Sequence, residues 1–90
     1  MIEYESDNDK KIYSTLKKYD IQFRYTQDLT YISQFLTGKV FYITERKTVL
    51  IDKTSDIWYN IDNEIFNLYG YSVIGINDIN NIFEDIKKII

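Results

Sequence analysis

The side chains that could carry chemistry in this chain are carboxylates, lysines, arginines and tyrosines, because its 90 residues contain no histidine and no cysteine. None of these groups has an ordinary pKa between about 5 and 8, where general acid and base catalysis is most effective. A reaction would need a strongly shifted carboxylate or lysine, or a bound metal ion. We therefore expect no enzymatic activity and no catalytic residue.

The spacing of the aspartates offers a candidate metal site. Asp7 and Asp9 begin a calcium-loop pattern, but its third ligand position holds Lys11 and no glycine follows. Asp52 and Asp56 lie on either side of a short polar stretch. Aspartate is favoured at helix N-termini and in turns, so we interpret all four as capping and turn residues. We predict no metal site and no cofactor.

The composition limits the class of protein. A hydrophobic content of 44% with 28% charged residues predicts a folded domain with its own core. Without cysteine, stability must come from side-chain packing, which suits a reducing compartment. No apolar run approaches the roughly 20 residues that cross a bilayer, and the first residues lack the basic start of a secretory signal. We expect a cytoplasmic protein that does not enter a membrane.

Apolar residues at intervals of three and four predict four helices, over residues 9–19, 29–37, 57–69 and 79–90. The second helix has Asp28 as its N-cap and Gly38 as the residue that ends it. The third ends at Gly70, although residues 57–61 also alternate in the manner of a strand. The apolar stripe of the last helix reaches Ile90, so either the protein's own sheet or a second copy must cover it.

Alternating apolar and polar residues predict four strands, over residues 21–26, 39–44, 48–52 and 72–76. The middle two flank residues 45–47, which predicts a hairpin whose loop lacks glycine. Between the outer helices the order is strand, helix, strand, strand, helix, strand. We therefore expect an α+β fold, with a ferredoxin-like split βαβ (βαββαβ) core and an extra N-terminal and C-terminal helix. If residues 57–61 form a strand, the alternative is a three-stranded antiparallel meander packed by helices.

The whole chain reads as one unit. We expect a single α+β domain over residues 9–90, because no repeat, linker or low-complexity tract interrupts this stretch. Residues 1–8 are acidic, and we expect them to form either a flexible arm or a short edge strand.

Aromatic residues make up 17% of the chain, more than so small a core is expected to hold. Tyrosine and tryptophan supply large, stiff contact areas at recognition surfaces. The predicted contact surface combines the two ends of the third helix with the turn before it: Trp58, Tyr59, Tyr69, Tyr71, Asp52 and Asp56. The alternative is that the rings stack on one another within the fold. We expect a protein partner, and a homodimer through the C-terminal helix if a second copy covers its stripe.

A rival interpretation is a single-stranded nucleic-acid-binding module of ferredoxin-like type. It would use the basic residues near the hairpin: Arg24, Lys39, Arg46, Lys47 and Lys53. The net charge of −3 argues against it, and strand 48–52 has neither the aromatic residue nor the glycine of RNA-recognition modules. Binding of this kind would weaken steeply with salt.

The coding bias suggests an origin. The chain has no alanine and no proline but is rich in isoleucine, asparagine, lysine and tyrosine, as AT-rich coding sequences tend to be. Phages and other mobile elements often encode short proteins of this kind. We therefore expect a small inhibitor or accessory protein that binds a host enzyme or a component of a defence system.

Overall fold

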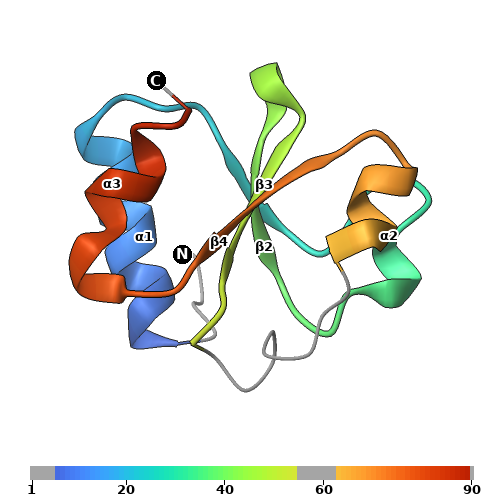
Figure 1. Ribbon diagram of the computed structural model, residues 1–90, viewed down its shortest axis with the longest axis horizontal. Helices are drawn as coiled ribbons and strands as arrows, with labels where there is room; N and C mark the ends of the chain where they lie inside the picture. The colour runs from blue at the N-terminus through green and yellow to red at the C-terminus, as the bar shows by residue number, and fades with distance from the viewer. Residues whose placement is uncertain (1–5, 55–62, 90) are drawn as a thin grey trace.

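The computed structural model describes residues 6–54 and 63–89 (Figure 1). They form an α+β domain in which a four-stranded mixed sheet lies between two layers. Helices α1 (Asp7–Lys18) and α3 (Ile82–Ile86) cover one face of the sheet, and α2 (Asn63–Leu68) lies on the other. The strands are β1 (Arg24–Thr26), β2 (Val40–Ile43), β3 (Thr48–Asp52) and β4 (Ser72–Ile76). The predicted α+β class is confirmed.

The strands follow one another across the sheet in chain order, β1-β2-β3-β4. β1 pairs antiparallel with β2, and β2 pairs antiparallel with β3, which places Tyr42 opposite Val49. β4 pairs parallel with β3, and Val73 is also opposite Val49. The ferredoxin-like split βαβ topology does not form, because that motif places another strand between its first two, which here are direct neighbours. The first three strands form a three-stranded antiparallel meander. The alternative expectation also contained such a meander, but it rested on residues 57–61 forming a strand, whereas the observed meander includes residues 24–26.

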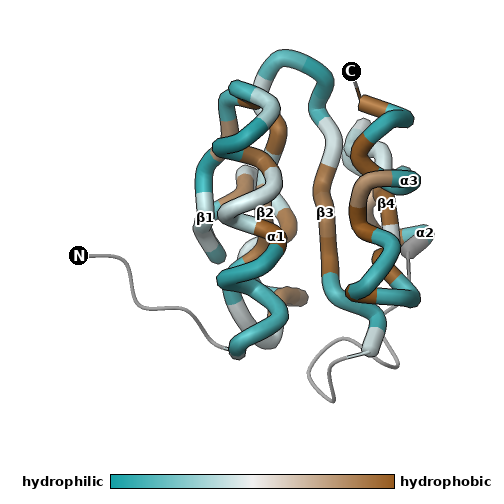
Figure 2. Tube along the Cα trace, turned by 90° about the vertical axis from the view of Figure 1, so that its left-hand side faces the viewer, coloured by the Kyte–Doolittle hydropathy of each residue, from teal (hydrophilic) through white to brown (hydrophobic). Residues whose placement is uncertain are grey.

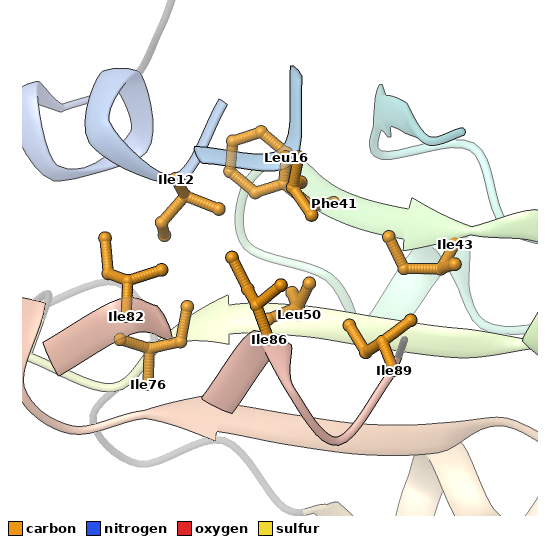
Figure 3. Close-up of a cluster of buried hydrophobic side chains, with 9 residues drawn as sticks. All are labelled: Ile12, Leu16, Phe41, Ile43, Leu50, Ile76, Ile82, Ile86 and Ile89. Atoms are coloured by element: carbon orange, nitrogen blue, oxygen red, sulfur yellow. The ribbon is translucent and has the colours of Figure 1, made fainter. Parts of the chain in front are cut away.

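The first core lies between the sheet and the α1–α3 layer. Figure 2 faces this layer and shows α1 nearer to β1 and β2, and α3 nearer to β4. The buried side chains that meet here are shown in Figure 3: Ile12, Leu16, Phe41, Ile43, Leu50, Ile76, Ile82, Ile86 and Ile89. Three of them, Ile82, Ile86 and Ile89, carry the apolar stripe of the C-terminal segment. The protein's own fold therefore covers these three residues, whereas Phe83 of the same stripe remains 39% exposed. The burial gives no support for a homodimer there.

The second core lies between the opposite face of the sheet and α2. It includes the chain between β1 and β2, and its buried residues are Leu29, Ile32, Leu36, Val40, Val49, Ile51, Phe66 and Tyr71. Along β3, Leu50 faces the first core while Val49 and Ile51 face the second, because side chains alternate along a strand. Every residue of β3 is buried, so this strand is the centre of the fold.

The predicted helix over residues 29–37 is wrong, because only a 3-10 turn, η1 (Ser33–Phe35), forms there. The hydroxyl of Ser33 accepts a hydrogen bond from the Leu29 N–H (3.0 Å) and donates one to the Leu29 carbonyl (2.7 Å). The Ser33 N–H also donates to the Leu29 carbonyl (3.1 Å), so backbone and side chain of Ser33 together close a single turn that does not continue as a helix. Tyr31 has a φ of 70°, which a right-handed helix does not contain. The connection of residues 27–39 has about the length that a parallel crossover requires, but it forms no crossover helix, and β2 returns antiparallel to β1.

The N-terminal helix is confirmed but begins earlier than predicted. α1 starts at Asp7, after Ser6, whose hydroxyl accepts a hydrogen bond from the Asp9 N–H. Such a cap satisfies one of the backbone donors that a helix leaves open at its start. The last two residues of the expected acidic arm, 7 and 8, thus belong to α1, whereas residues 1–5 lie outside the described ranges.

The later helices are confirmed in part. α2 is followed by Gly70 with a φ of 87°, the left-handed residue predicted to end this helix. The predicted residues 57–62, and with them the choice between helix and strand at 57–61, lie outside the described ranges. The last helix is divided into a 3-10 turn, η3 (Ile79–Asn81), and α3. Asp78 caps the 3-10 turn, because its carboxylate accepts a hydrogen bond from the Asn80 N–H.

The predicted hairpin and final strand are confirmed. β2 and β3 are joined by η2 (Thr44–Arg46) and by Lys47, whose φ of 45° and ψ of 42° are left-handed. Lys47 thus occupies the position where hairpin loops often use glycine. β4 has the predicted bounds. Of the predicted strand 21–26, only Arg24–Thr26 pairs, although Ile21 and Phe23 still pack against the first core.

Candidate functional site

The structure separates the residues predicted to form the contact surface. Tyr69 is exposed, whereas Tyr71 and Asp52 are only 7% and 2% exposed. Burial removes these two side chains from the surface that a partner can reach. The other predicted contact residues lie outside the described ranges: Trp58, Tyr59 and Asp56.

Asp52 is held by hydrogen bonds within the fold. Its Oδ1 accepts from the backbone N–H (2.9 Å) and the hydroxyl (2.5 Å) of Thr54, and its Oδ2 accepts from Nδ2 of Asn8 (3.1 Å). A buried carboxylate needs such partners, because leaving it unsatisfied would be costly. Since Asn8 belongs to α1, these bonds join the start of that helix to the end of β3. Asp52 therefore has a structural role.

Tyr71 belongs to the second core. Its ring packs edge-on against Tyr42, with 5.6 Å between ring centroids, and Nζ of Lys47 lies 5.4 Å from its centroid. Its hydroxyl donates to the Thr30 carbonyl (3.4 Å). Burial raises the pKa of Tyr42 above its ordinary value of 10.0, and the neighbouring Tyr71 adds to this, while Arg24 acts in the opposite direction.

Tyr69 lies in a group of exposed apolar side chains on the α2 face. Its ring stacks on that of Tyr31, with centroids 6.0 Å apart and planes inclined by 20°. Tyr31 is 76% exposed, and Leu68, the last residue of α2, is 78% exposed. We call Tyr31, Leu68 and Tyr69 the tyrosine patch. An open groove of about 410 Å³ lies beside it, lined by both tyrosines together with Ser33 and Gln34.

The backbone at Tyr31 is unfavourable for tyrosine. Tyr31 is the third residue of a turn that is closed by a hydrogen bond from the Ile32 N–H to the Leu29 carbonyl (3.2 Å), and its φ is 70°. Glycine or asparagine is usual where a turn needs a positive φ, because a Cβ in the left-handed region costs about 1 to 2 kcal/mol. Strained residues of this kind gather at functional sites. Tyr31 combines such strain with an exposed ring.

Sequence reasoning missed two members of the tyrosine patch. Tyr31 lay within the predicted helix 29–37, where nothing distinguished it from other surface positions. Leu68 matched the apolar stripe of the predicted helix 57–69 and was not among the predicted contact residues. The structure buries Phe66 instead, which turns Leu68 toward solvent. The short distance from Leu68 to Gly70 was an available signal, because the last turn of a helix often lies beyond the core.

The basic residues proposed for nucleic-acid binding do not gather in one place. Arg46 and Lys47 lie in the hairpin turn, at one end of β3, whereas Lys53 follows its other end. Lys39 precedes β2 and therefore also lies at the end away from the turn. At about 3.4 Å per residue, the two groups are about 20 Å apart along the sheet. Arg24 is exposed in β1, opposite Tyr42.

Residues 6–54 and 63–89 contain neither a candidate metal site nor a candidate membrane-spanning helix. No group of three or more carboxylates in these ranges is placed to hold a metal ion. No helix in them has the length and apolar content that a membrane span requires.

Comparisons with known proteins give no family assignment. No family model, no curated protein and no solved structure is significantly similar to this chain.

Proposed function

We propose that this chain is a non-enzymatic protein-binding module and that the tyrosine patch is its contact surface. The observation that supports this most directly is Tyr31, which keeps an exposed ring on an unfavourable left-handed backbone. Stability does not account for a tyrosine there, because glycine adopts the same conformation without the steric cost. Recognition does account for it, since tyrosine offers a large and stiff contact area.

The tyrosine patch has the composition of an interface hot spot. Aromatic anchors carry most of the energy in protein interfaces, and truncating one often costs about 2 kcal/mol or more. The stacking of Tyr31 on Tyr69 fixes the orientation of both rings before a partner arrives. Less side-chain entropy is then lost on binding. The matching partner surface is an apolar pocket with hydrogen-bond acceptors for the phenol hydroxyls.

The biological role that we propose is that of a small cytoplasmic inhibitor or accessory protein. It would be encoded by a phage or another mobile element and would act on a host enzyme or defence system by occupying it. The support for this role is compositional: a chain of 90 residues with no cysteine, no proline and many isoleucines, asparagines and tyrosines.

Affinity capture with matched variants tests the proposal. The tagged chain is incubated with a lysate of the cells that carry its gene, and the recovered proteins are identified by mass spectrometry. A double variant, Tyr31→Gly with Tyr69→Ser, removes both rings of the tyrosine patch. The control is Phe83→Leu, which removes an exposed ring from the opposite face of the sheet. A partner should be recovered with the wild type and the control, and lost with the double variant.

Binding of that partner is then measured with purified proteins. Each ring removed should weaken the affinity by about 30-fold, the equivalent of about 2 kcal/mol. Equal affinity of the wild type and the double variant would reject the tyrosine patch as the contact surface. Turnover of a substrate by the purified chain would reject the non-enzymatic part of the proposal.

A further inference from the structure

We propose that a second surface of this protein, the groove between α1 and the η3–α3 segment, binds single-stranded nucleic acid. The groove has a volume of about 470 Å³ and is lined by Lys10, Lys11 and Lys18, with the rings of Tyr19 and Phe83. We call these five residues the lysine groove. It lies on the opposite face of the sheet from the tyrosine patch (Figure 1), so the two proposals are independent.

The lysines of the groove are available to an anionic ligand. None of the residues that line the groove is acidic. Within the described parts of the chain, the ammonium groups of Lys10, Lys11 and Lys18 form no ion pair. In contrast, the two lysines that follow α3 each pair with a carboxylate three residues earlier. The lining of the groove thus carries three positive charges and no negative one, although the net charge of the chain is −3.

The spacing of the lysines indicates a ligand with several anionic groups. Lys10 and Lys11 lie near the start of α1, and Lys18 is its last residue. At 1.5 Å per residue, the distance from Lys10 to Lys18 along the helix is about 12 Å. Lysines separated in this way are matched better by two phosphates than by one. A chain of phosphates provides this match.

The rings indicate that the ligand also carries flat apolar groups. Tyr19 and Phe83 stack on each other, with centroids 5.0 Å apart, and Phe83 remains 39% exposed. Nζ of Lys18 lies 5.7 Å from the centroid of Tyr19, and Nζ of Lys87 lies 4.9 Å from that of Phe83, so a positive charge adjoins each ring and must move aside where a base stacks. Proteins that bind single strands combine a basic groove for the backbone with rings on which bases stack. An acidic peptide matches the charge but has no flat group on each unit, so the rings favour nucleic acid.

Fluorescence anisotropy with a labelled oligothymidylate of about eight nucleotides, within the range that one such site covers, tests the inference. Oligouridylate of the same length shows whether DNA and RNA are bound alike. If each of the three lysines contacts one phosphate, the affinity should fall roughly 20-fold when salt rises from about 50 to about 200 mM. A complete absence of binding at the lower salt concentration overturns the inference.

Matched variants place the site. Lys11→Gln with Lys18→Gln removes two charges from the lysine groove, and Arg24→Gln with Arg46→Gln removes two exposed charges elsewhere. The groove variant should bind at least about tenfold more weakly, and the slope of log affinity against log salt should become shallower by about 1.4. The control should keep the wild-type affinity and slope. An equal loss in both variants overturns the assignment to the groove.

Phe83→Leu tests the stacking separately from the charge. It should weaken binding of the oligothymidylate by about tenfold, in the range of base stacking on a ring. It should leave the weaker binding of an abasic strand of equal length unchanged. Equal effects on both strands would show that no base uses the ring and would overturn the inference. The inference would also be overturned if polyglutamate or anionic vesicles displaced the labelled strand as effectively as an unlabelled oligonucleotide of equal total charge.

Discussion

The two faces of the sheet are covered in different ways. On the α1–α3 face, a capped twelve-residue helix and the C-terminal segment bury four isoleucines and Leu16 at helical spacing. On the α2 face, the cover consists of a six-residue helix and a chain between β1 and β2 that contains a turn with a left-handed tyrosine. The first arrangement gains stability from regular packing. The second holds exposed rings in fixed positions, which is what a contact surface requires.

The largest effect expected from this comparison concerns two leucines. Leu16 is fully buried in the first core, and its replacement by alanine should lower the free energy of unfolding by about 2 to 5 kcal/mol, because a cavity remains. Leu68→Ala in the tyrosine patch should change it by no more than about 0.5 kcal/mol, since the side chain is already in water. Urea unfolding followed by circular dichroism measures both. Similar losses for the two variants would show that the tyrosine patch is part of the stabilising core.

A smaller effect is expected where the α2 face uses left-handed residues. Gly70→Ala should lower the free energy of unfolding by about 1 to 2 kcal/mol, because a Cβ at a φ of 87° is strained. Tyr31→Gly should raise the free energy of unfolding by up to about 1 kcal/mol, because it relieves the backbone strain. Two smaller losses oppose this gain: the stacking on Tyr69 disappears, and glycine loses more conformational entropy than tyrosine when the chain folds. The same urea experiment measures both signs. A clear loss of stability for Tyr31→Gly would mean that the ring supports the fold. It would contradict the proposal that Tyr31 is present for binding a partner.

The smallest effect concerns the pH dependence of the α2 face. The pKa of Tyr42 is raised in the folded state, chiefly by burial, so the folded protein holds this proton more tightly than the unfolded chain. The stabilisation is complete below about pH 10 and is lost as pH rises through the folded pKa. Tyr42→Phe cannot ionise and should lose less stability between neutral and alkaline pH. Unfolding curves across this range measure the difference, and parallel losses in both proteins would contradict the assigned cause.

Much of the fold could be predicted because local patterns coincide with tertiary packing. Ile12 and Leu16 form one helical face, and strand 72–76 is short, β-branched and followed by a capping residue. These signals lie within a few residues of one another. The order of the strands could not be predicted from local patterns, because it depends on whether the chain between β1 and β2 forms a helix. There the left-handed φ of Tyr31 interrupts the predicted helix, and a pattern of apolar residues cannot show that.

The candidate surfaces were less accessible from sequence than the fold. The number of aromatic residues correctly indicated that some rings are exposed, but not which ones. Tyr69 and Tyr71 are two residues apart, yet one lies in the tyrosine patch and the other in the second core. The positive charges near the hairpin looked like one cluster in the sequence and are divided between the two ends of β3. The lysine groove forms between α1 and η3, which are about 60 residues apart in the chain but in contact in the structure. Local sequence patterns do not show a contact between such distant segments.

The chain-order arrangement of the strands has a consequence for the route of folding. β2 and β3 are joined by residues 44–47 alone, and such a pairing closes quickly because little loop entropy is lost. β1 and β2 are joined by residues 27–39, a longer connection that is still shorter than the one from β3 to β4. β4 must return across residues 53–71 to align parallel with β3. We therefore expect the meander to nucleate the domain and β4 to dock afterwards. Until it docks, one long edge of β3 stays open to pairing with another chain.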